Sequence, residues 1–139
     1  MTRSRPMFHV GILVPDLAAA QAEISAAQGV TWRETRQSRY GDWDIRVVYA
    51  VEGPPYVELI EGPEGSPWAS DGGPRLDHFG IWSEDVAVDV EAFMAAGFVI
   101  DFDPRSVGKP LTFCYLRGTA TGTRIELVST ELRRLRGLA

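Results

Sequence analysis

Two histidines and two glutamates recur in this sequence at nearly equal spacing. His9 opens the segment HVGILVPD and His78 opens the segment HFGIWSED. Glu58 follows the first histidine and Glu126 follows the second after almost the same number of residues. Imidazole and carboxylate groups are suitable ligands for borderline divalent metals. The repeat therefore predicts a metal site whose ligands are His9, Glu58, His78 and Glu126.

Alternation along strands places these four side chains on one side of a sheet, because successive strand residues point to opposite faces. The apolar neighbours of each histidine and glutamate then face the helices. Two carboxylates on a largely apolar face would repel each other and lose hydration unless a cation lay between them. Gly11 and Gly80, each on the histidine side of its strand, leave room for a ligand.

A helix is expected after each histidine strand. Asp16 and Asp85 can each cap a helix N-terminus, and apolar residues then recur at helical spacing. A glycine suited to a left-handed C-terminal position follows each segment. The pattern predicts helices over Leu17–Gln28 and Val86–Ala96.

Each half offers three further strand candidates, and the last of them carries the glutamate. In the first half these are Thr31–Arg36, Ile45–Val51 and the segment YVELI; in the second they are Phe98–Phe102, Leu111–Leu116 and the segment RIELV. Each half is thus a β-α-β-β-β module. We expect an α+β fold in which two tandem modules form a curved eight-stranded mixed sheet with the helices on its convex side.

The modules set the expected organisation of the chain. Residues 1–62 form the first module and residues 76–130 the second. Residues 63–75 are a Gly/Pro-rich linker or a loop that covers the substrate. Residues 131–139 form a short C-terminal tail with leucines at helical spacing, as in a small packing helix.

The composition is that of an ordinary globular protein, with 45% apolar and 24% charged residues. A net charge of −5 opposes nucleic acid as a partner, because phosphate binding depends on basic side chains. Cys114 is the single cysteine, so no internal disulfide forms. The N-terminal apolar run is interrupted by His9 and recurs in mid-chain, which argues against a signal peptide. We expect a cytoplasmic protein with no membrane partner.

The duplicated module with these four residues resembles the vicinal oxygen chelate superfamily, which includes glyoxalase I, methylmalonyl-CoA epimerase, extradiol dioxygenases and bleomycin-resistance proteins. The resemblance covers residues 8–129 and implies one divalent ion (Ni, Co, Zn, Fe or Mn), a small-molecule substrate and a homodimer. The epimerase-like branch is the most similar overall. In that branch a third-strand glutamate transfers protons, whereas Arg46 stands at that position here.

The resemblance implies a metal-dependent isomerase, epimerase or lyase that acts on a small carbonyl compound, such as an acyl thioester, through a stabilised enolate. It assigns Glu126 a role as base. Arg46 is expected on the same face as the ligands, where it either binds a substrate carboxylate or phosphate or forms a structural ion pair. Two other functions remain open: an Fe(II) extradiol-type dioxygenase, and a metal-free protein that binds a small molecule or drug.

Overall fold

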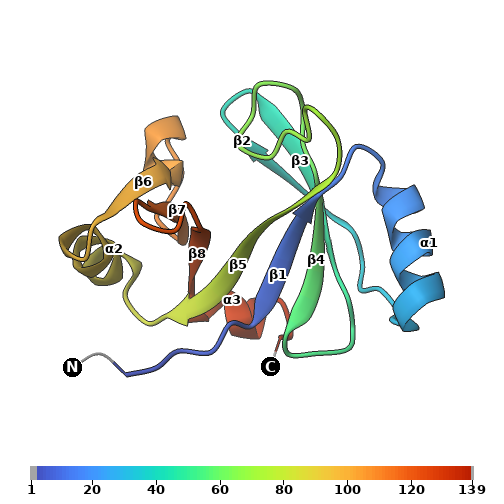
Figure 1. The fold of residues 1–139 in the computed structure, drawn as a ribbon, viewed down its shortest axis with the longest axis horizontal. Coiled ribbons are helices and arrows are strands. Elements are labelled where there is room, and N and C mark those ends of the chain that lie inside the picture. Colours follow the sequence, from blue (N-terminus) through green and yellow to red (C-terminus); the bar gives the residue numbers. More distant parts are fainter. Residues whose placement is uncertain (1–2, 139) are drawn as a thin grey trace. The chain divides into compact units, whose positions relative to one another are not determined.

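The computed structural model describes residues 3–138 and contains two copies of the expected β-α-β-β-β order (Figure 1). The elements in chain order are β1 (His9–Leu13), α1 (Leu17–Gln28), β2 (Arg36–Tyr40), β3 (Trp43–Tyr49), β4 (Tyr56–Glu61), β5 (Arg75–Ser83), α2 (Val86–Ala95), β6 (Phe98–Phe102), the 3₁₀ turn η1 (Pro104–Val107), β7 (Phe113–Gly118), β8 (Arg124–Ser129) and α3 (Thr130–Leu135). The predicted α+β class with eight strands of mixed direction is confirmed.

The chain divides into two compact units. The first unit is His9–Asp77, and the second unit consists of the segment before His9 together with the chain from His78 onward. Each unit is described below by itself.

The first unit contains a sheet with the strand order β2-β3-β4-β1. β1 runs parallel to β4, whereas β2, β3 and β4 are antiparallel neighbours. Helix α1 covers one face of this sheet, where Leu17 packs with Val48 and Leu59 (Figure 1). We call this face the helix side and the opposite face, which carries His9, the histidine side.

The second unit repeats this plan with the strand order β5-β8-β7-β6. β5 runs parallel to β8, and α2 packs against β6, β7 and β8. Val86 and Val90 of α2 pack with Ile81, Leu116 and Leu127. The face of this sheet that carries His78 is again the histidine side.

The two predicted aspartate caps are present. The Asp16 carboxylate accepts a hydrogen bond of 3.0 Å from the Ala19 N–H, and the Asp85 carboxylate accepts one of 3.1 Å from the Val88 N–H. Gly29 ends α1 with a φ of 74°, a left-handed conformation that favours glycine. The caps thus position each helix directly after its histidine strand.

One strand prediction was wrong. The second strand of the first unit is Arg36–Tyr40, not Thr31–Arg36. Within the expected segment Trp32 forms a single bridge to Ala50, and the side chain of Thr31 is held by Glu52. These local contacts hold the segment beside β3 without extending the hydrogen-bonded ladder.

The Gly/Pro-rich segment 63–75 is anchored to the first unit by Trp68. This side chain is 1% exposed and packs against Tyr40 at 5.2 Å and Trp43 at 6.4 Å between ring centroids. A side chain at Gly62 would come within 2.7 Å of the Trp68 Cβ, so the close approach requires glycine. Residues around Trp68 are therefore packed against β2 and β3 of the first unit.

The residues before β1 pack on the second unit. Phe8 stacks on Trp82 with 3.6 Å between ring centroids, and its N–H donates to the Gly80 carbonyl at 2.8 Å. Arg5 donates to both carboxylate oxygens of Asp89 at 2.7 and 3.1 Å. This N-terminal arm, residues 5–8, is thus fixed to β5 and α2.

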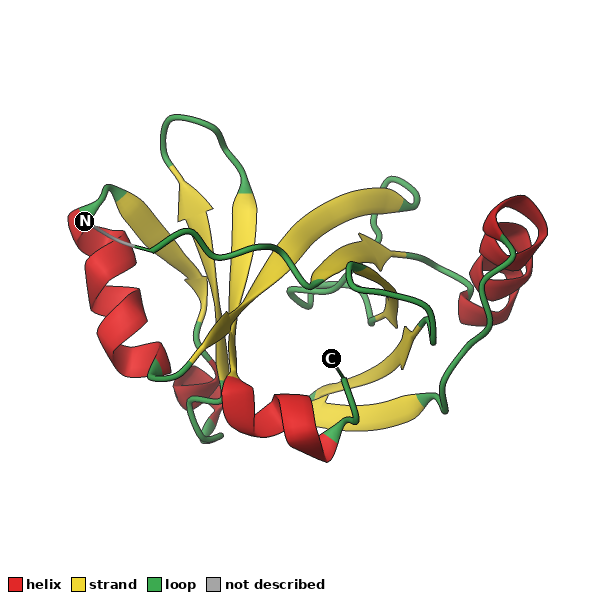
Figure 2. Cartoon of the chain, turned by 90° about the horizontal axis from the view of Figure 1, so that it is seen from below, coloured by secondary structure: helices red, strands yellow, loops and turns green. Residues whose placement is uncertain are grey.

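Helix α3 lies close to the C-terminus (Figure 2). Leu138 after it is buried, whereas Leu135 is 78% exposed, so the predicted packing helix uses only part of its leucine pattern. Among the described residues, none of the helices combines the length and the apolar character needed to cross a membrane.

Candidate functional site

His9 and Glu58 form a buried pair on the histidine side of the first unit. The parallel register of β1 and β4 places Gly11 beside Glu58, so the glutamate and His9 share a face. His9 is 0% and Glu58 4% exposed, and 3.2 Å separates His9 Nε2 from Glu58 Oε1. Leu13 and Ile60, a register pair on the same face, add apolar surroundings.

His78 and Glu126 form the same pair in the second unit. Gly80 lies beside Glu126 in the parallel register of β5 and β8, as Gly11 lies beside Glu58. His78 is 4% and Glu126 7% exposed, and 3.3 Å separates His78 Nε2 from Glu126 Oε1. The structure therefore joins each histidine to the glutamate of its own module.

A tyrosine borders each pair, and the sequence did not single out these positions as a pair. Tyr49 is the register partner of Glu58, and Tyr115 is the register partner of Glu126. The Tyr49 ring meets His9 at 5.6 Å with an interplanar angle of 88°, and the Tyr115 ring meets His78 at 4.9 Å and 73°. These edge-to-face contacts support both imidazoles. Strand register, which reaches across the sheet, was the signal needed to find them.

The second unit also carries a buried arginine on its histidine side. Arg124 is 3% exposed, and its guanidinium carbon lies 3.9 Å from the centroid of the Tyr115 ring. Its Nε lies 2.9 Å from an Asp101 carboxylate oxygen. A cation this close to an aromatic face is attracted by the ring electrons.

Arg46, expected beside the ligands, lies on the other face. It is the register partner of Glu61, whereas Tyr49 is the partner of Glu58, so Arg46 points to the helix side. Its Nη1 lies 3.5 Å from Glu61 Oε1, and the other oxygen of Glu61 accepts from the Leu17 N–H at 2.9 Å. The expected orientation of Arg46 was wrong, because the histidine side of β3 carries the buried apolar set and the polar set faces away.

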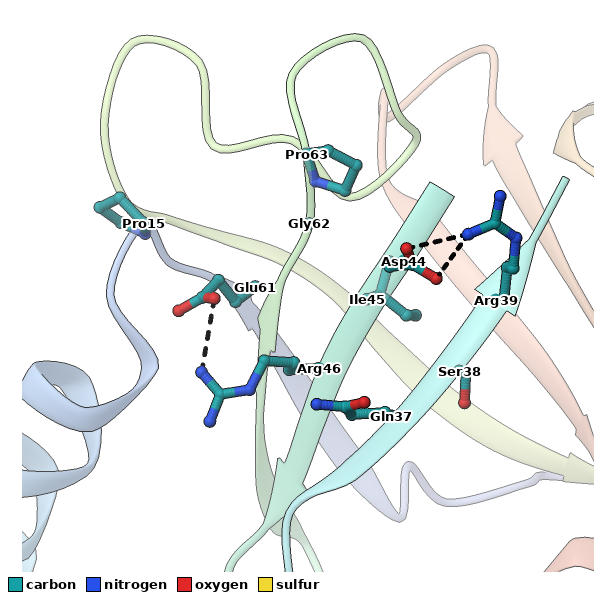
Figure 3. Close-up of a pocket in the computed structure, with 10 residues that line it drawn as sticks. All are labelled: Pro15, Gln37, Ser38, Arg39, Asp44, Ile45, Arg46, Glu61, Gly62 and Pro63. Carbon is teal, nitrogen blue, oxygen red and sulfur yellow. Dashed lines mark hydrogen bonds and ion pairs between the residues drawn. The ribbon is translucent and has the colours of Figure 1, made fainter. Parts of the chain in front are cut away.

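Arg46 instead lines a pocket of about 760 Å³ in the first unit (Figure 3). Arg39 and Asp44 form a second ion pair in this pocket, with 2.9 Å between their closest atoms. Both arginines of the pocket thus already face carboxylates, and its ionic groups balance. A substrate-binding role for Arg46 remains a prediction, and it would act from this pocket rather than beside Glu58.

Trp68, Trp82 and Cys114 are packed structural groups in this structure. Trp68 packs in the first unit as described, and Trp82 stacks on Phe8 with Arg133 5.7 Å from its ring centroid. Cys114 is fully buried in the apolar cluster under α2, and burial raises the pKa of its thiol to about 12. A protonated, buried thiol is a poor nucleophile.

The donor set of each pair fits a divalent ion. Two ligand atoms about 2.1 Å from one ion, at tetrahedral or octahedral angles, lie about 3.0–3.4 Å apart. The separations of 3.2 and 3.3 Å fall in this interval. The same separations also suit an ion pair between a protonated imidazole and a carboxylate, so the two states differ in protonation and not in distance.

Comparison with known proteins establishes the family. Residues 8–115 match the Glyoxalase/Bleomycin resistance protein/Dioxygenase superfamily. The chain belongs to this superfamily. The matched range contains three of the four predicted ligands of this glyoxalase-superfamily protein, His9, Glu58 and His78, and the repeat of the module supplies Glu126.

Solved structures share the fold of this glyoxalase-superfamily protein. A hypothetical protein from Bacillus halodurans C-125 has a TM-score of 0.73 at 16% identity, covering 91% of this chain and 95% of that chain. Methylmalonyl-CoA epimerase from Mycobacterium tuberculosis has a TM-score of 0.67 at 18% identity, with 88% and 86% covered. A Streptomyces coelicolor methylmalonyl-CoA epimerase variant in complex with 2-nitronate-propionyl-CoA has a TM-score of 0.68 at 20% identity, with 92% and 98% covered. A search of curated proteins gave no match. At these identities the likeness establishes the fold alone.

Proposed function

We propose that this protein is a divalent-metal-dependent isomerase, epimerase or lyase acting on a small carbonyl compound, with an acyl thioester as the first substrate class to test. The observation that carries the proposal is the pair of matched, buried His–Glu contacts, one in each unit. Superfamily membership and the epimerases of the same fold support the reaction class.

The proposed ligands are His9, Glu58, His78 and Glu126. Each unit supplies one imidazole and one carboxylate, and a divalent ion with four such ligands would carry little net charge. That balance favours burial, because unpaired buried carboxylates are costly. When bound, the ion would supply a positive charge that stabilises negative charge on a carbonyl oxygen of the substrate.

Glu126 is the proposed base. Its carboxylate would take a proton from the carbon next to the substrate carbonyl and return a proton to that carbon or to a neighbouring one. Tyr115, its register partner, and Val128, two residues further along β8, are buried on the same face and would help to exclude water from the carbanion. Return of a proton to the opposite face of the same carbon is epimerisation, and return to a neighbouring atom is isomerisation.

Two measurements test the proposal together. Metal analysis of the purified protein should find a stoichiometric divalent ion, and acyl-thioester, 2-oxo and 2-hydroxy acid candidates in D₂O should incorporate deuterium only in metal-loaded protein. Glu126→Gln should slow incorporation by about 100-fold or more, because general-base catalysis contributes on this scale. Glu58→Gln serves as the matched variant, expected to weaken metal binding without removing the base.

Other outcomes would replace the proposal. Oxygen consumption with catechols and Fe(II) would favour the dioxygenase. Tight binding of an apolar compound by protein that takes up no metal would favour a binding protein, with each His–Glu pair acting as an ion pair. We also propose a homodimer on the basis of the family resemblance, and sedimentation of a monomer at micromolar concentration would contradict it.

A further inference from the structure

Arg124 is a buried cation without a role in the proposed reaction. It lies on the histidine side of the second unit, as the register partner of His78 and two residues before Glu126 on the same strand. Only 3% of its surface is exposed. Burial of a guanidinium raises the free energy of the folded state unless neighbouring groups compensate its charge.

The contacts of Arg124 lead directly to His78. The guanidinium lies 3.9 Å from the Tyr115 ring centroid on one side and 2.9 Å from Asp101 on the other. Tyr115 is itself 2% exposed and meets the His78 ring edge-to-face at 4.9 Å. His78 Nε2 then lies 3.3 Å from Glu126. Asp101, Arg124, Tyr115 and His78 therefore form one continuous packed series.

The first unit differs at the matching position. The repeat aligns Arg124 with Tyr56, which packs edge-to-face on Tyr49 with 6.5 Å between ring centroids. The nearest described cations there are partly exposed, with Arg36 5.8 Å from the Tyr49 ring and Arg33 5.5 Å from the Tyr56 ring. The guanidinium of Arg36 thus lies farther from the tyrosine that contacts His9, at 5.8 Å, than the guanidinium of Arg124 lies from Tyr115, at 3.9 Å.

We infer that Arg124 is a positioning residue that fixes the Tyr115 ring and, through it, the orientation of the His78 imidazole toward Glu126. The torsion that rotates an imidazole about its Cβ–Cγ bond has broad minima, so neighbouring contacts decide where the ring stays. The planar guanidinium stacks on the tyrosine face, whereas the compact ammonium of lysine would not hold the ring in the same way. The consequence for metal affinity rests on the proposed function, whereas the consequence for the ring does not.

The chain offers a closely matched control in Arg117. This residue lies opposite Arg124 in the register of β7 and β8 and contacts the same Asp101 oxygen, at 3.0 Å. Its side chain is 43% exposed. Replacing either arginine removes one positive charge and leaves Asp101 the other. Arg124→Met and Arg117→Met therefore change the net charge equally, and they differ in burial and in the contact with Tyr115.

The test compares wild type, Arg124→Met, Arg124→Lys and Arg117→Met in two ways. In metal-free protein at one pH, long-range ¹H–¹⁵N correlation spectra report ring nitrogens, and the sequence contains two histidines, so His9 is an internal reference. In the second measurement, Co²⁺ or Zn²⁺ affinity is determined by competition with a chelator. We expect both Arg124 variants to shift or broaden the His78 signals without changing those of His9. We also expect Arg124→Met to weaken metal binding by about 10-fold or more, the usual effect of removing a group that orients a ligand.

The inference is overturned if Arg124→Met leaves the His78 signals unchanged, or if Arg117→Met changes them equally. Should Arg124→Met fail to fold, Arg124→Lys decides, because it retains a positive charge and removes the planar guanidinium that stacks on Tyr115. Wild-type protein that binds no metal would contradict the proposed function, while the spectra of the metal-free proteins would still decide the role of Arg124.

Discussion

The rings of His9 and Tyr49 meet nearly at right angles, at 88° and 5.6 Å between their centroids. Tyr49 is in turn the register partner of Glu58, so the histidine is held between a carboxylate and an aromatic ring of its own unit. His9 is therefore packed on the face opposite to α1, and its removal leaves the helix-side core in place.

Replacing His9 by alanine should lower the divalent metal content sharply while the fold persists. The change deletes a proposed ligand, and the cost in unfolding free energy should be about 1–3 kcal/mol, typical of a buried substitution. Metal analysis and far-UV circular dichroism measure the two effects. The exposed Glu64 provides a control, since Glu64→Ala should change neither. Full metal occupancy in His9→Ala would show that His9 is not a ligand.

Replacing Arg46 by methionine should leave metal affinity within about twofold of wild type, because separate sites are nearly independent. Arg46 faces Glu61 on the helix side, away from the His9–Glu58 pair. Competition with a chelator measures the metal affinity of Arg46→Met, with Glu58→Gln as the positive control. A loss in Arg46→Met comparable to that in Glu58→Gln would mean that Arg46 acts on the metal site after all.

Replacing Asp89 by asparagine should weaken the attachment of the N-terminal arm and reduce the acid sensitivity of stability. Burial opposes ionisation of Asp89, but hydrogen bonds from Arg5 and Ser83 outweigh it and lower the pKa of the carboxyl. A lowered folded-state pKa contributes stability above the unfolded-state pKa, and this stability is lost as the pH falls through the folded-state pKa.

Urea unfolding at several pH values measures this effect. The loss at neutral pH should be about 0.5–1 kcal/mol, since the ion pair is partly solvated. The difference between wild type and Asp89→Asn should shrink as the pH falls into the acid range where Asp89 titrates. A difference that stays constant down to strongly acid pH would rule out the ion pair as its cause.

Cys114 should be unreactive in the folded protein. Burial raises the pKa of this thiol to about 12, so the thiolate is scarce at neutral pH, and the side chain is fully covered. Ellman's reagent, a disulfide, should release about one equivalent of its coloured thiolate when it reacts with the protein in guanidinium. With the native protein it should release almost none. Fast reaction of native protein would contradict the burial of Cys114.

Strand periodicity predicted which residues share a face, because it needs only local alternation. His9 with Glu58 and His78 with Glu126 each lie together for this reason. The polar set of β3 does not mark the histidine side, because Val47 and Tyr49 on that side are buried and Arg46 lies on the opposite face. Buried sites of this kind are lined mainly by apolar groups.

The features that the sequence did not predict depend on pairing and packing between strands. β2 has the sequence RQSRY, which lacks apolar alternation, and its pairing with β3 is what makes it a strand. The contact of Arg124 with Tyr115 joins β8 to β7, and its contact with Asp101 joins β8 to β6. No local pattern encodes such partners, since they follow from register and from the path of the chain.

The packing of the N-terminal arm sets a limit on dividing this chain. A cut in the Gly/Pro-rich segment would separate Phe8 from the second unit, on which it packs. A fragment beginning near His78 would leave Trp82 without its stacking partner, Gly80 without the N–H of Phe8, and Asp89 without Arg5. A fragment that contains the second unit would therefore need residues 5–8 joined to it by a new connection before it could be studied alone.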